Sequence, residues 1–254
     1  SMHRLVQEIA QYQLLESDRR SRLKSTIRWL FPRRYNWLQP NHRKWLQRSL
    51  QMLNGFCTGD PSNVNTWAPI YSPARPHLAR ILPTADKAGI AQPTARLMNE
   101  FGLHLHARAD FADAEPLYRR ALSIDETSYG PNHPTVAIRL NNLAELLRVT
   151  NRRSEAEPLY RRALSISATS YGPNHPEVAR GLNGLAGLLD ATNRPVEAEP
   201  LSRRSVEILV QFRQQTGHKH PHFEAVLGWY RSILESLGLD AAATESRLRS
   251  LLQP

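Results

Sequence analysis

The sequence has very little cysteine and no long apolar segment. Cys57 is the single cysteine among 254 residues, so no disulfide can form within one chain, and we expect a reducing, cytoplasmic setting. No uninterrupted apolar run of about 18 residues occurs, so we expect no membrane partner. His3 and Arg4 lead into an amphipathic stretch rather than an apolar one, which argues against a signal peptide.

The sequence also lacks the residue patterns of common catalytic and metal sites. No G-x-x-x-x-G-K-[ST] loop is present, which excludes a P-loop ATPase within these residues. Cys57 has no histidine near it in the sequence, and no set of nucleophile, base and orienting group stands out. His218, His220 and His222 alternate, but no cysteine or carboxylate cluster completes a zinc set with them. We therefore expect a protein that is not an enzyme and that has no cofactor or metal.

The dominant feature of the sequence is an internal repeat. Residues 114–134 read AEPLYRRALSIDETSYGPNHP and residues 156–176 read AEPLYRRALSISATSYGPNHP, identical at 19 of 21 positions and 42 residues apart. A degraded third copy, AEPLSRRS, begins at Ala198, and its loop is displaced by three extra residues. A fixed period of this length predicts stacked supersecondary units instead of one globular core. Such arrays usually bind partners rather than transform them.

The basic residues are concentrated before the repeats. Residues 1–90 carry 14 Lys or Arg against 5 Asp or Glu, whereas residues 91–254 carry 19 against 18. Four of the five tryptophans lie in the basic part, where basic residues interleave with them, as in Arg28-Trp29 and Lys44-Trp45: Trp29, Trp37, Trp45 and Trp67. Aromatic and basic residues together can bind single-stranded nucleic acid. The alternative, which we favour, is a small helical core covered by the stems of Arg and Lys.

The chain is expected to have two parts, both helical. A basic, tryptophan-containing connector module spans 2–90, with helices predicted near 3–16, 21–31, 41–54 and 76–88. A repeat array spans 91–254, with three full repeats at about 92–129, 134–171 and 176–214, and a capping helix pair at 221–252. Proline and glycine mark the ends of the predicted helices.

Pro134 and Pro176 are expected to open helices, because the first helical position needs no N–H donor. Gly130 and Gly172 are expected to end helices in a left-handed cap. Three further prolines are expected near helix starts, where N–H groups lack helical partners anyway: Pro116, Pro158 and Pro200.

The spacing of large and small residues in the repeats is that of a known two-helix unit. The second repeat places Leu140, Leu143-Ala144 and Leu147 before Ala156 and Tyr160, as in the pattern W-x2-L-G-x2-Y followed by A-x3-F. The array therefore resembles tetratricopeptide repeats. Its 42-residue period, LNNLAELL run and GPNHP loop resemble the kinesin-light-chain subclass, over about residues 92–238. The resemblance implies an all-α fold, a right-handed superhelical solenoid, and a peptide or protein ligand.

The fourth helix pair departs from this pattern. Arg231 stands where a small residue is expected, so a further repeat cannot pack closely there. We interpret this pair as a terminal cap with a polar outer face.

A second resemblance concerns the start of the chain. Residues 2–7, MHRLVQ, look like the MHD-type motif that ends the winged helix of NB-ARC nucleotide switches. Asp60-Pro61 through Thr66-Trp67 and Leu82-Pro83 resemble the connector that leads from that motif into repeats in bacterial proteins. This resemblance implies that the chain is the sensor or scaffold arm of a larger bacterial signalling protein.

The predicted binding residues lie on the first helix of each repeat. Asn99, Asn141 and Asn183 are 42 residues apart, and an asparagine offers both a donor and an acceptor to a peptide backbone. In the resembling family this asparagine clamps the ligand; the alternative is that it only joins adjacent helices. Other residues at the same helical phase are expected to set specificity, and their mixed charges predict neither a simply acidic nor a simply basic ligand: Arg96, His106, Ile138, Glu145, Arg148, Arg180 and Asp190.

Two alternatives to peptide binding remain at this point. The basic part can bind nucleic acid, in which case affinity falls steeply with salt. The chain can also assemble with itself, through the groove or through the N-terminal part.

Overall fold

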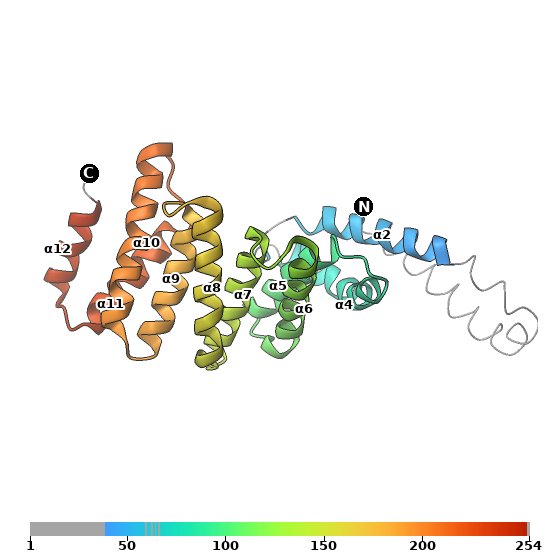
Figure 1. Cartoon of the computed structure of the whole chain (residues 1–254), viewed down its shortest axis with the longest axis horizontal. Helices are drawn as coiled ribbons and strands as arrows, with labels where there is room; N and C mark the ends of the chain where they lie inside the picture. Colours follow the sequence, from blue (N-terminus) through green and yellow to red (C-terminus); the bar gives the residue numbers. More distant parts are fainter. Residues whose placement is uncertain (1–38, 59, 62, 64, 66, 253–254) are drawn as a thin grey trace, which may run out of the picture. The chain divides into compact units, whose positions relative to one another are not determined.

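The computed structural model describes residues 39–252 except 59, 62, 64 and 66, and its secondary structure there is entirely helical (Figure 1). No strand occurs among these residues, which confirms the all-α prediction. The helices predicted near 3–16 and 21–31, Trp29, Trp37 and the motif at residues 2–7 lie outside the described residues.

The chain forms two compact units that divide between Ala107 and Arg108. The boundary expected near residue 91 therefore stays a prediction. The two helices of the first expected repeat fall in different units, and each unit is described here by itself.

The N-terminal unit contains α2 (Gln39–Phe56), the short π-helix η2 (Trp67–Tyr71), α4 (Ser72–Lys87) and α5 (Thr94–Ala107). One face of α2 buries Leu46, Leu50 and Leu53, as the helical spacing predicts. α4 packs against α2, η2 and α5. Arg43 of α2 donates to the carbonyl oxygen of Ala88 at 2.8 Å, where α4 ends.

The C-terminal unit begins with α6 (Phe111–Tyr129) and continues as three helical hairpins. These are α7 (Pro134–Val149) with α8 (Arg153–Tyr171), α9 (Pro176–Ala191) with α10 (Pro195–Thr216), and α11 (Phe223–Ser236) with α12 (Ala241–Leu252). Each helix packs against the next, and α9 also contacts α7 and α11. We call α7, α9 and α11 the first-helix layer, since each is the first helix of its hairpin.

The repeated GPNHP loop sets where α7 and α9 begin. His133 Nδ1 accepts a hydrogen bond from the Thr135 N–H at 3.2 Å, and His175 Nδ1 accepts from the Glu177 N–H at 3.1 Å. Each imidazole also stacks on the tyrosine that ends the preceding helix, Tyr129 at 4.7 Å and Tyr171 at 4.5 Å between ring centres. These histidines therefore cap helices by satisfying an N–H that has no helical partner.

Glycine and proline occupy the helix ends less simply than the sequence predicts. Gly130 and Gly172 end α6 and α8 at φ of +90° and +87°, but their ψ of 159° and 161° lies outside the left-handed helical region. Pro116 lies deeper than expected, because the Ala114 N–H already bonds the Asp110 carbonyl oxygen at 3.1 Å. Pro158 and Pro200 are also inside their helices. In each case the residue four positions earlier is exposed, so water can satisfy its carbonyl oxygen.

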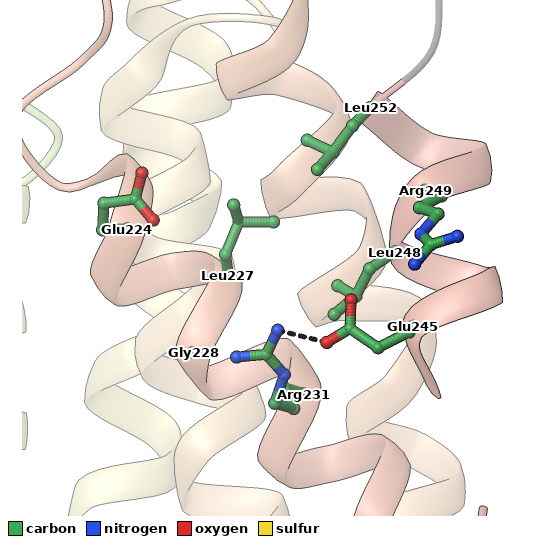
Figure 2. Close-up of a pocket in the computed structure, with 8 residues that line it drawn as sticks. All are labelled: Glu224, Leu227, Gly228, Arg231, Glu245, Leu248, Arg249 and Leu252. Atoms are coloured by element: carbon green, nitrogen blue, oxygen red, sulfur yellow. Dashed lines mark hydrogen bonds and ion pairs between the residues drawn. The ribbon is translucent and has the colours of Figure 1, made fainter. Parts of the chain in front are cut away.

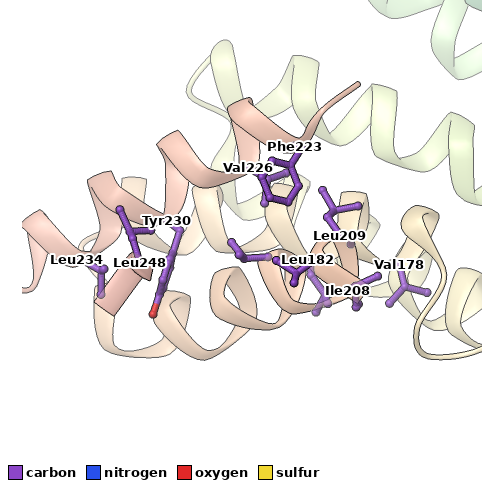
Figure 3. Close-up of a cluster of buried hydrophobic side chains, with 12 residues drawn as sticks. Val178, Leu182, Ile208, Leu209, Phe223, Val226, Tyr230, Leu234 and Leu248 are labelled. Atoms are coloured by element: carbon purple, nitrogen blue, oxygen red, sulfur yellow. The ribbon is translucent and has the colours of Figure 1, made fainter. Parts of the chain in front are cut away.

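The core of the C-terminal unit runs between the last two hairpins (Figure 3). Val178 and Leu182 of α9 and Ile208 and Leu209 of α10 pack with apolar residues of the final hairpin: Phe223, Val226, Tyr230, Leu234 and Leu248. A smaller cluster joins α7 and α8 through Val136, Leu140 and Ile166. No hairpin buries its apolar face alone, which is the expected behaviour of stacked repeats.

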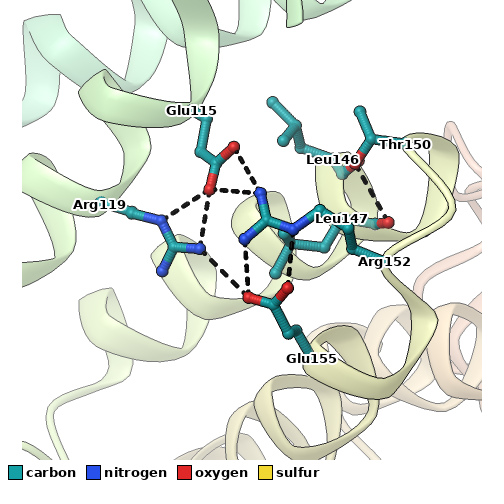
Figure 4. A network of polar contacts seen from close by, with 7 residues as sticks. All are labelled: Glu115, Arg119, Leu146, Leu147, Thr150, Arg152 and Glu155. Atoms are coloured by element: carbon teal, nitrogen blue, oxygen red, sulfur yellow. Dashed lines mark hydrogen bonds and ion pairs between the residues drawn. The ribbon is translucent and has the colours of Figure 1, made fainter. Parts of the chain in front are cut away.

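Ion pairs fix the register between successive hairpins (Figure 4). Arg152, between α7 and α8, bonds Glu115 of α6 at 2.7 Å and Glu155 of α8 at 2.7 Å, and Arg119 joins both carboxylates. The arrangement recurs one period on, where Arg194 bonds Glu157 at 2.9 Å and Glu197 at 2.7 Å. We call these two clusters the register network. They link the α7–α8 hairpin to α6 and the α9–α10 hairpin to α8.

One ion pair is buried and is not repeated. Arg139 Nε donates to Asp125 Oδ2 at 2.8 Å, and the Asp125 side chain is fully buried. The equivalent positions 42 residues on are Ser167 and Gly181, both buried. The same packing site is therefore built with charges in one repeat and with small residues in the next.

The final hairpin ends in a polar pair. Arg231 of α11 pairs with Glu245 of α12 at 2.6 Å, and both side chains are about half exposed. Arg231 occupies the register of Ala144 and Ala186, which are buried. The interpretation of this hairpin as a terminal cap stays a prediction.

Candidate binding face

The structure places the predicted residues of α7 and α9 on the first-helix layer. Asn141 is 6% exposed, and both polar atoms of its side chain lack a hydrogen-bond partner. Asn183 is half-buried, and its Oδ1 is also without a partner. Buried amides are normally hydrogen-bonded, and leaving one unsatisfied costs about 1–3 kcal/mol. These two amides therefore have unused bonding capacity.

Glu145 and Arg148 of α7 form the centre of a polar chain across the layer. Arg148 donates from Nε and Nη2 to the two Glu145 carboxylate oxygens at 2.8 and 2.6 Å. The Tyr160 hydroxyl of α8 donates to Glu145 Oε2 at 2.7 Å. On the other side, the Arg148 guanidinium carbon lies 5.5 Å from the ring centre of Trp229, on α11. This series of side-chain contacts thus connects α8, α7 and α11.

The surroundings of Arg148 and Tyr160 fix the charge state of both side chains. The hydrogen bond from Arg148 to Glu145 raises the pKa of the Arg148 guanidinium further above neutrality, against the opposing effect of burial. Burial, together with the neighbouring Glu145 carboxylate, raises the pKa of the Tyr160 hydroxyl well above its usual value. Arg148 is therefore charged and Tyr160 is a neutral donor throughout the physiological range.

Two glycines of α9 make room for this arrangement. A Cβ at Gly184 would lie 2.5 Å from the ring of Tyr160, so no side chain fits there without displacing the ring. A Cβ at Gly187 would meet Trp229 at 3.9 Å, an ordinary contact that leaves no space for a larger side chain. Trp229 therefore lies against a part of α9 that has no side chains.

Our sequence reasoning did not single out Tyr160, Gly184, Gly187 or Trp229 as part of a site. The sequence does relate some of them: Asn142, Gly184 and Trp229 occupy equivalent positions in successive repeats, once the three extra loop residues are counted. That position changes from amide to glycine to indole along the array, so it carries no periodic signature.

Arg180 and Asp190 complete the predicted set on α9. Arg180 Nη2 pairs with Glu177 Oε2 at 2.8 Å, one turn away on the same helix. Asp190 lies in the last turn of α9, is half-buried, and makes no ion pair with any described residue.

The other three predicted residues, Arg96, Asn99 and His106, lie on α5 in the N-terminal unit. Arg96 is engaged there: it donates to Asn54 Oδ1 at 2.5 Å and to the Cys57 carbonyl oxygen at 3.4 Å. Asn99 is 2% exposed and His106 is half-buried. The predicted residues on α7 and α9 thus belong to one layer of helices in the C-terminal unit, and those on α5 belong to the N-terminal unit.

Cys57 has the environment of a structural thiol. It is fully buried, and burial, with a smaller contribution from Glu100, raises its pKa to about 11. At neutral pH it is therefore protonated and a poor nucleophile, in agreement with the sequence interpretation.

Within the described residues no three His, Cys, Asp or Glu side chains are grouped as metal ligands. Among those same residues, no helix has the length and apolar character needed to cross a membrane.

A small pocket lies on the last hairpin and not on the predicted face (Figure 2). It has a volume of about 150 Å³ and is lined by Glu224, Leu227, Gly228, Arg231, Glu245, Leu248, Arg249 and Leu252. Small-molecule sites usually enclose about 300–1,000 Å³. The Arg231–Glu245 pair also crosses this pocket, so it is better described as part of the polar end of the array.

Comparison with known proteins identifies the repeat. Residues 93–169 and 140–209 match the family model described as tetratricopeptide repeat. The comparison with curated proteins finds no match. The match and the helical architecture together confirm the predicted tetratricopeptide solenoid fold.

Solved structures with similar folds are kinesin-light-chain proteins. A Podospora anserina putative kinesin light chain with nearly identical TPR-like repeats is 17% identical, with a TM-score of 0.55, over 84% of this chain and 92% of that one. BtubC (BKLC) from P. vanneervenii is also 17% identical, with a TM-score of 0.57, over 84% of this chain and 90% of that one. At this identity the likeness concerns the fold alone.

Proposed function

Residues 93–209 carry tetratricopeptide repeats, and we propose that the first-helix layer of α7, α9 and α11 binds an extended peptide or the surface of another protein. Repeat arrays of this kind serve as interaction scaffolds, because each hairpin adds its own side chains to one continuous surface. The proposed role is binding, without a chemical transformation of the ligand.

The observation that carries this proposal is the pair of unsatisfied amides, Asn141 and Asn183. A peptide backbone supplies one N–H donor and one C=O acceptor per residue, which is what two such amides require. The amides recur at a spacing of 42 residues on neighbouring helices. Their unpartnered atoms are buried, so an extended ligand meets both once the two side chains turn toward it. Because these atoms have no partner within the structure, binding is the use that we propose for them.

We further propose that the chain is the sensor or scaffold arm of a larger bacterial signalling protein. This part of the proposal rests on the sequence resemblance of residues 2–7 and of the connector to NB-ARC proteins. In that setting, capture of a ligand by the array would be relayed to a partner domain.

The amide proposal is tested by a pull-down from a combinatorial decapeptide library with wild type and the Asn141→Ala/Asn183→Ala variant. We expect the variant to lose capture by about tenfold, since two backbone hydrogen bonds disappear. The matched control is Asn132→Ala/Asn174→Ala, which removes two exposed asparagines of the repeated loop, also 42 residues apart.

The control variant should capture peptides as wild type does. Neither side chain of the Asn141/Asn183 pair has an intramolecular bond through the atoms that were unpartnered, so the thermal unfolding midpoint should change little. Equal capture by the Asn141/Asn183 variant and wild type would refute the assignment of these amides to ligand binding.

A further inference from the structure

The charges of the first-helix layer do not cancel completely. Arg148 is bonded to Glu145 and Arg180 is paired with Glu177, so each of these cations is neutralised on its own helix. Arg139 is buried against Asp125. Arg148 and Arg139 are therefore hydrogen-bonded to carboxylates, whereas Arg180 is paired with Glu177 by proximity and its Nε and Nη2 atoms have no hydrogen-bond partner.

Two carboxylates are left over. On α11, Arg231 pairs with Glu245, and Glu224 pairs with Lys219. Among the charged residues of the three helices of the layer, Asp190 and Glu235 are the two that make no ion pair with a described residue. Both lie in the last turn of their helices, where the helix dipole is already negative. Asp190 and Glu235 thus add negative charge near the carboxyl ends of α9 and α11, while Arg153 donates to the Ala191 carbonyl oxygen at the end of α9 at 2.6 Å.

An exposed aromatic ring rests on the helix that carries one of these carboxylates. Trp229 is 38% exposed and rests on Gly187, which is three residues before Asp190 and therefore on the same face of α9. The guanidinium of Arg148 already lies over this indole at 5.5 Å. The ring therefore accepts a cation in the geometry that the fold imposes on it.

We propose that the ligand of the first-helix layer is basic: a Lys or Arg side chain of the bound segment pairs with Asp190 while its aliphatic stem lies on the Trp229 indole. A carboxylate next to an exposed aromatic face is a combination that favours a cation with an apolar stem. The inference rests on the proposed function and specifies the chemistry of its ligand.

An acidic ligand is disfavoured at the same place. It would meet Asp190, Glu235 and the negative ends of two helices. Arg148 attracts an acidic ligand only weakly, because its Nε and Nη2 atoms already donate to the two Glu145 carboxylate oxygens. Removing Asp190 would leave the aromatic contact but take away the charge pairing.

The test is the composition of the peptides captured from the same decapeptide library by wild type, Asp190→Asn and Trp229→Leu. Wild type should enrich Lys and Arg about fivefold or more over their frequency in the library. Asp190→Asn should abolish the enrichment, and should weaken binding of one captured Arg-containing decapeptide by about tenfold, as expected for a lost charge-assisted hydrogen bond. Trp229→Leu should lower the affinity for this peptide as well.

The matched control is Glu224→Gln, which removes an exposed carboxylate of the layer that is paired with Lys219. It changes the net charge by the same amount and should keep the enrichment. Capture without Lys or Arg enrichment, or enrichment that survives in Asp190→Asn, would overturn the basic-ligand inference and leave the binding function standing. Capture that does not depend on Asn141 and Asn183 would overturn the proposed function and this inference with it.

Discussion

At the scale of single residues, the turn between the two helices of a hairpin depends on one left-handed position. Asn151 and Asn193 hold it at φ of +63° and +59°, but the equivalent residue before α6 is Ala109, at φ of +62°. This conformation costs a residue with a Cβ about 1–2 kcal/mol. The cost is smaller for asparagine than for alanine, because the asparagine side chain can form a local hydrogen bond.

We therefore expect Ala109→Asn to raise the free energy of unfolding by about 1 kcal/mol. The reciprocal change, Asn151→Ala, should lower it by a similar amount. Urea titration followed by circular dichroism measures both. Opposite signs for the two variants support the argument, whereas destabilisation by Ala109→Asn would contradict it.

The buried Arg139–Asp125 pair is a second feature that belongs to the residue scale. Removing one member leaves the other charge buried without a partner, which costs about 3–5 kcal/mol, so Arg139→Ala should destabilise the unit by that amount. The double variant Asp125→Ser/Arg139→Gly copies the residues of the next repeat and should be more stable than Arg139→Ala alone. A thermodynamic cycle over single and double variants measures the coupling, and strictly additive costs would show that the pair is not coupled.

At the scale of the helices, the register network makes the joints between hairpins sensitive to acid. Burial acts to raise the pKa of Glu115, but the bonds from Arg119 and Arg152 outweigh it, and the pKa is lowered overall. The pKa of Glu157 is lowered as well, first by Arg161 and then by Arg194. Because these carboxylates bind protons less readily when folded, their contribution is present above about pH 4.5 and is lost as the pH falls through the folded-state pKa.

Arg152→Ala should therefore lower the thermal unfolding midpoint by a few degrees at pH 7, and the difference from wild type should shrink as the pH is brought to 3. Differential scanning calorimetry between pH 3 and pH 7 gives both values. Arg249→Ala, which removes an exposed arginine of α12, is the control and should shift the midpoint equally little at every pH. A difference that stays constant between pH 7 and pH 3 would show that the ion pairs contribute nothing.

At the scale of the whole molecule, the parts that could be predicted are those that each repeat specifies locally. The second full repeat was expected at about 134–171, and its two helices are Pro134–Val149 and Arg153–Tyr171. These bounds follow from caps and turns that lie within one repeat, such as His133 and Gly130. That Asn141 and Asn183 lie at equivalent places on α7 and α9 also follows from the period of 42 residues, while their role in binding stays a prediction.

The contacts between repeats could not be predicted in the same way. Trp229 of α11 lies beside Gly187 of α9 and contacts Arg148 of α7, and no single repeat contains that information. Whether Arg148 and Arg180 form ion pairs with nearby glutamates depends on side-chain rotamers, which the sequence does not give. The sequence therefore shows only a mixture of charges, whereas the structure leaves Asp190 without an ion pair among the described residues. Periodicity predicts the features that recur in each repeat, whereas the proposed specificity lies in Asp190 and Trp229, which do not recur.

The register network has a consequence for how such a chain can grow. Arg152 and Arg194 make equivalent bonds to the preceding hairpin, and the units that contain them are nearly interchangeable. A gene duplication that inserted another 42-residue module between them would therefore supply each new junction with its own arginine and glutamates. Lengthening by recombination is thus compatible with the junctions in the interior of the array.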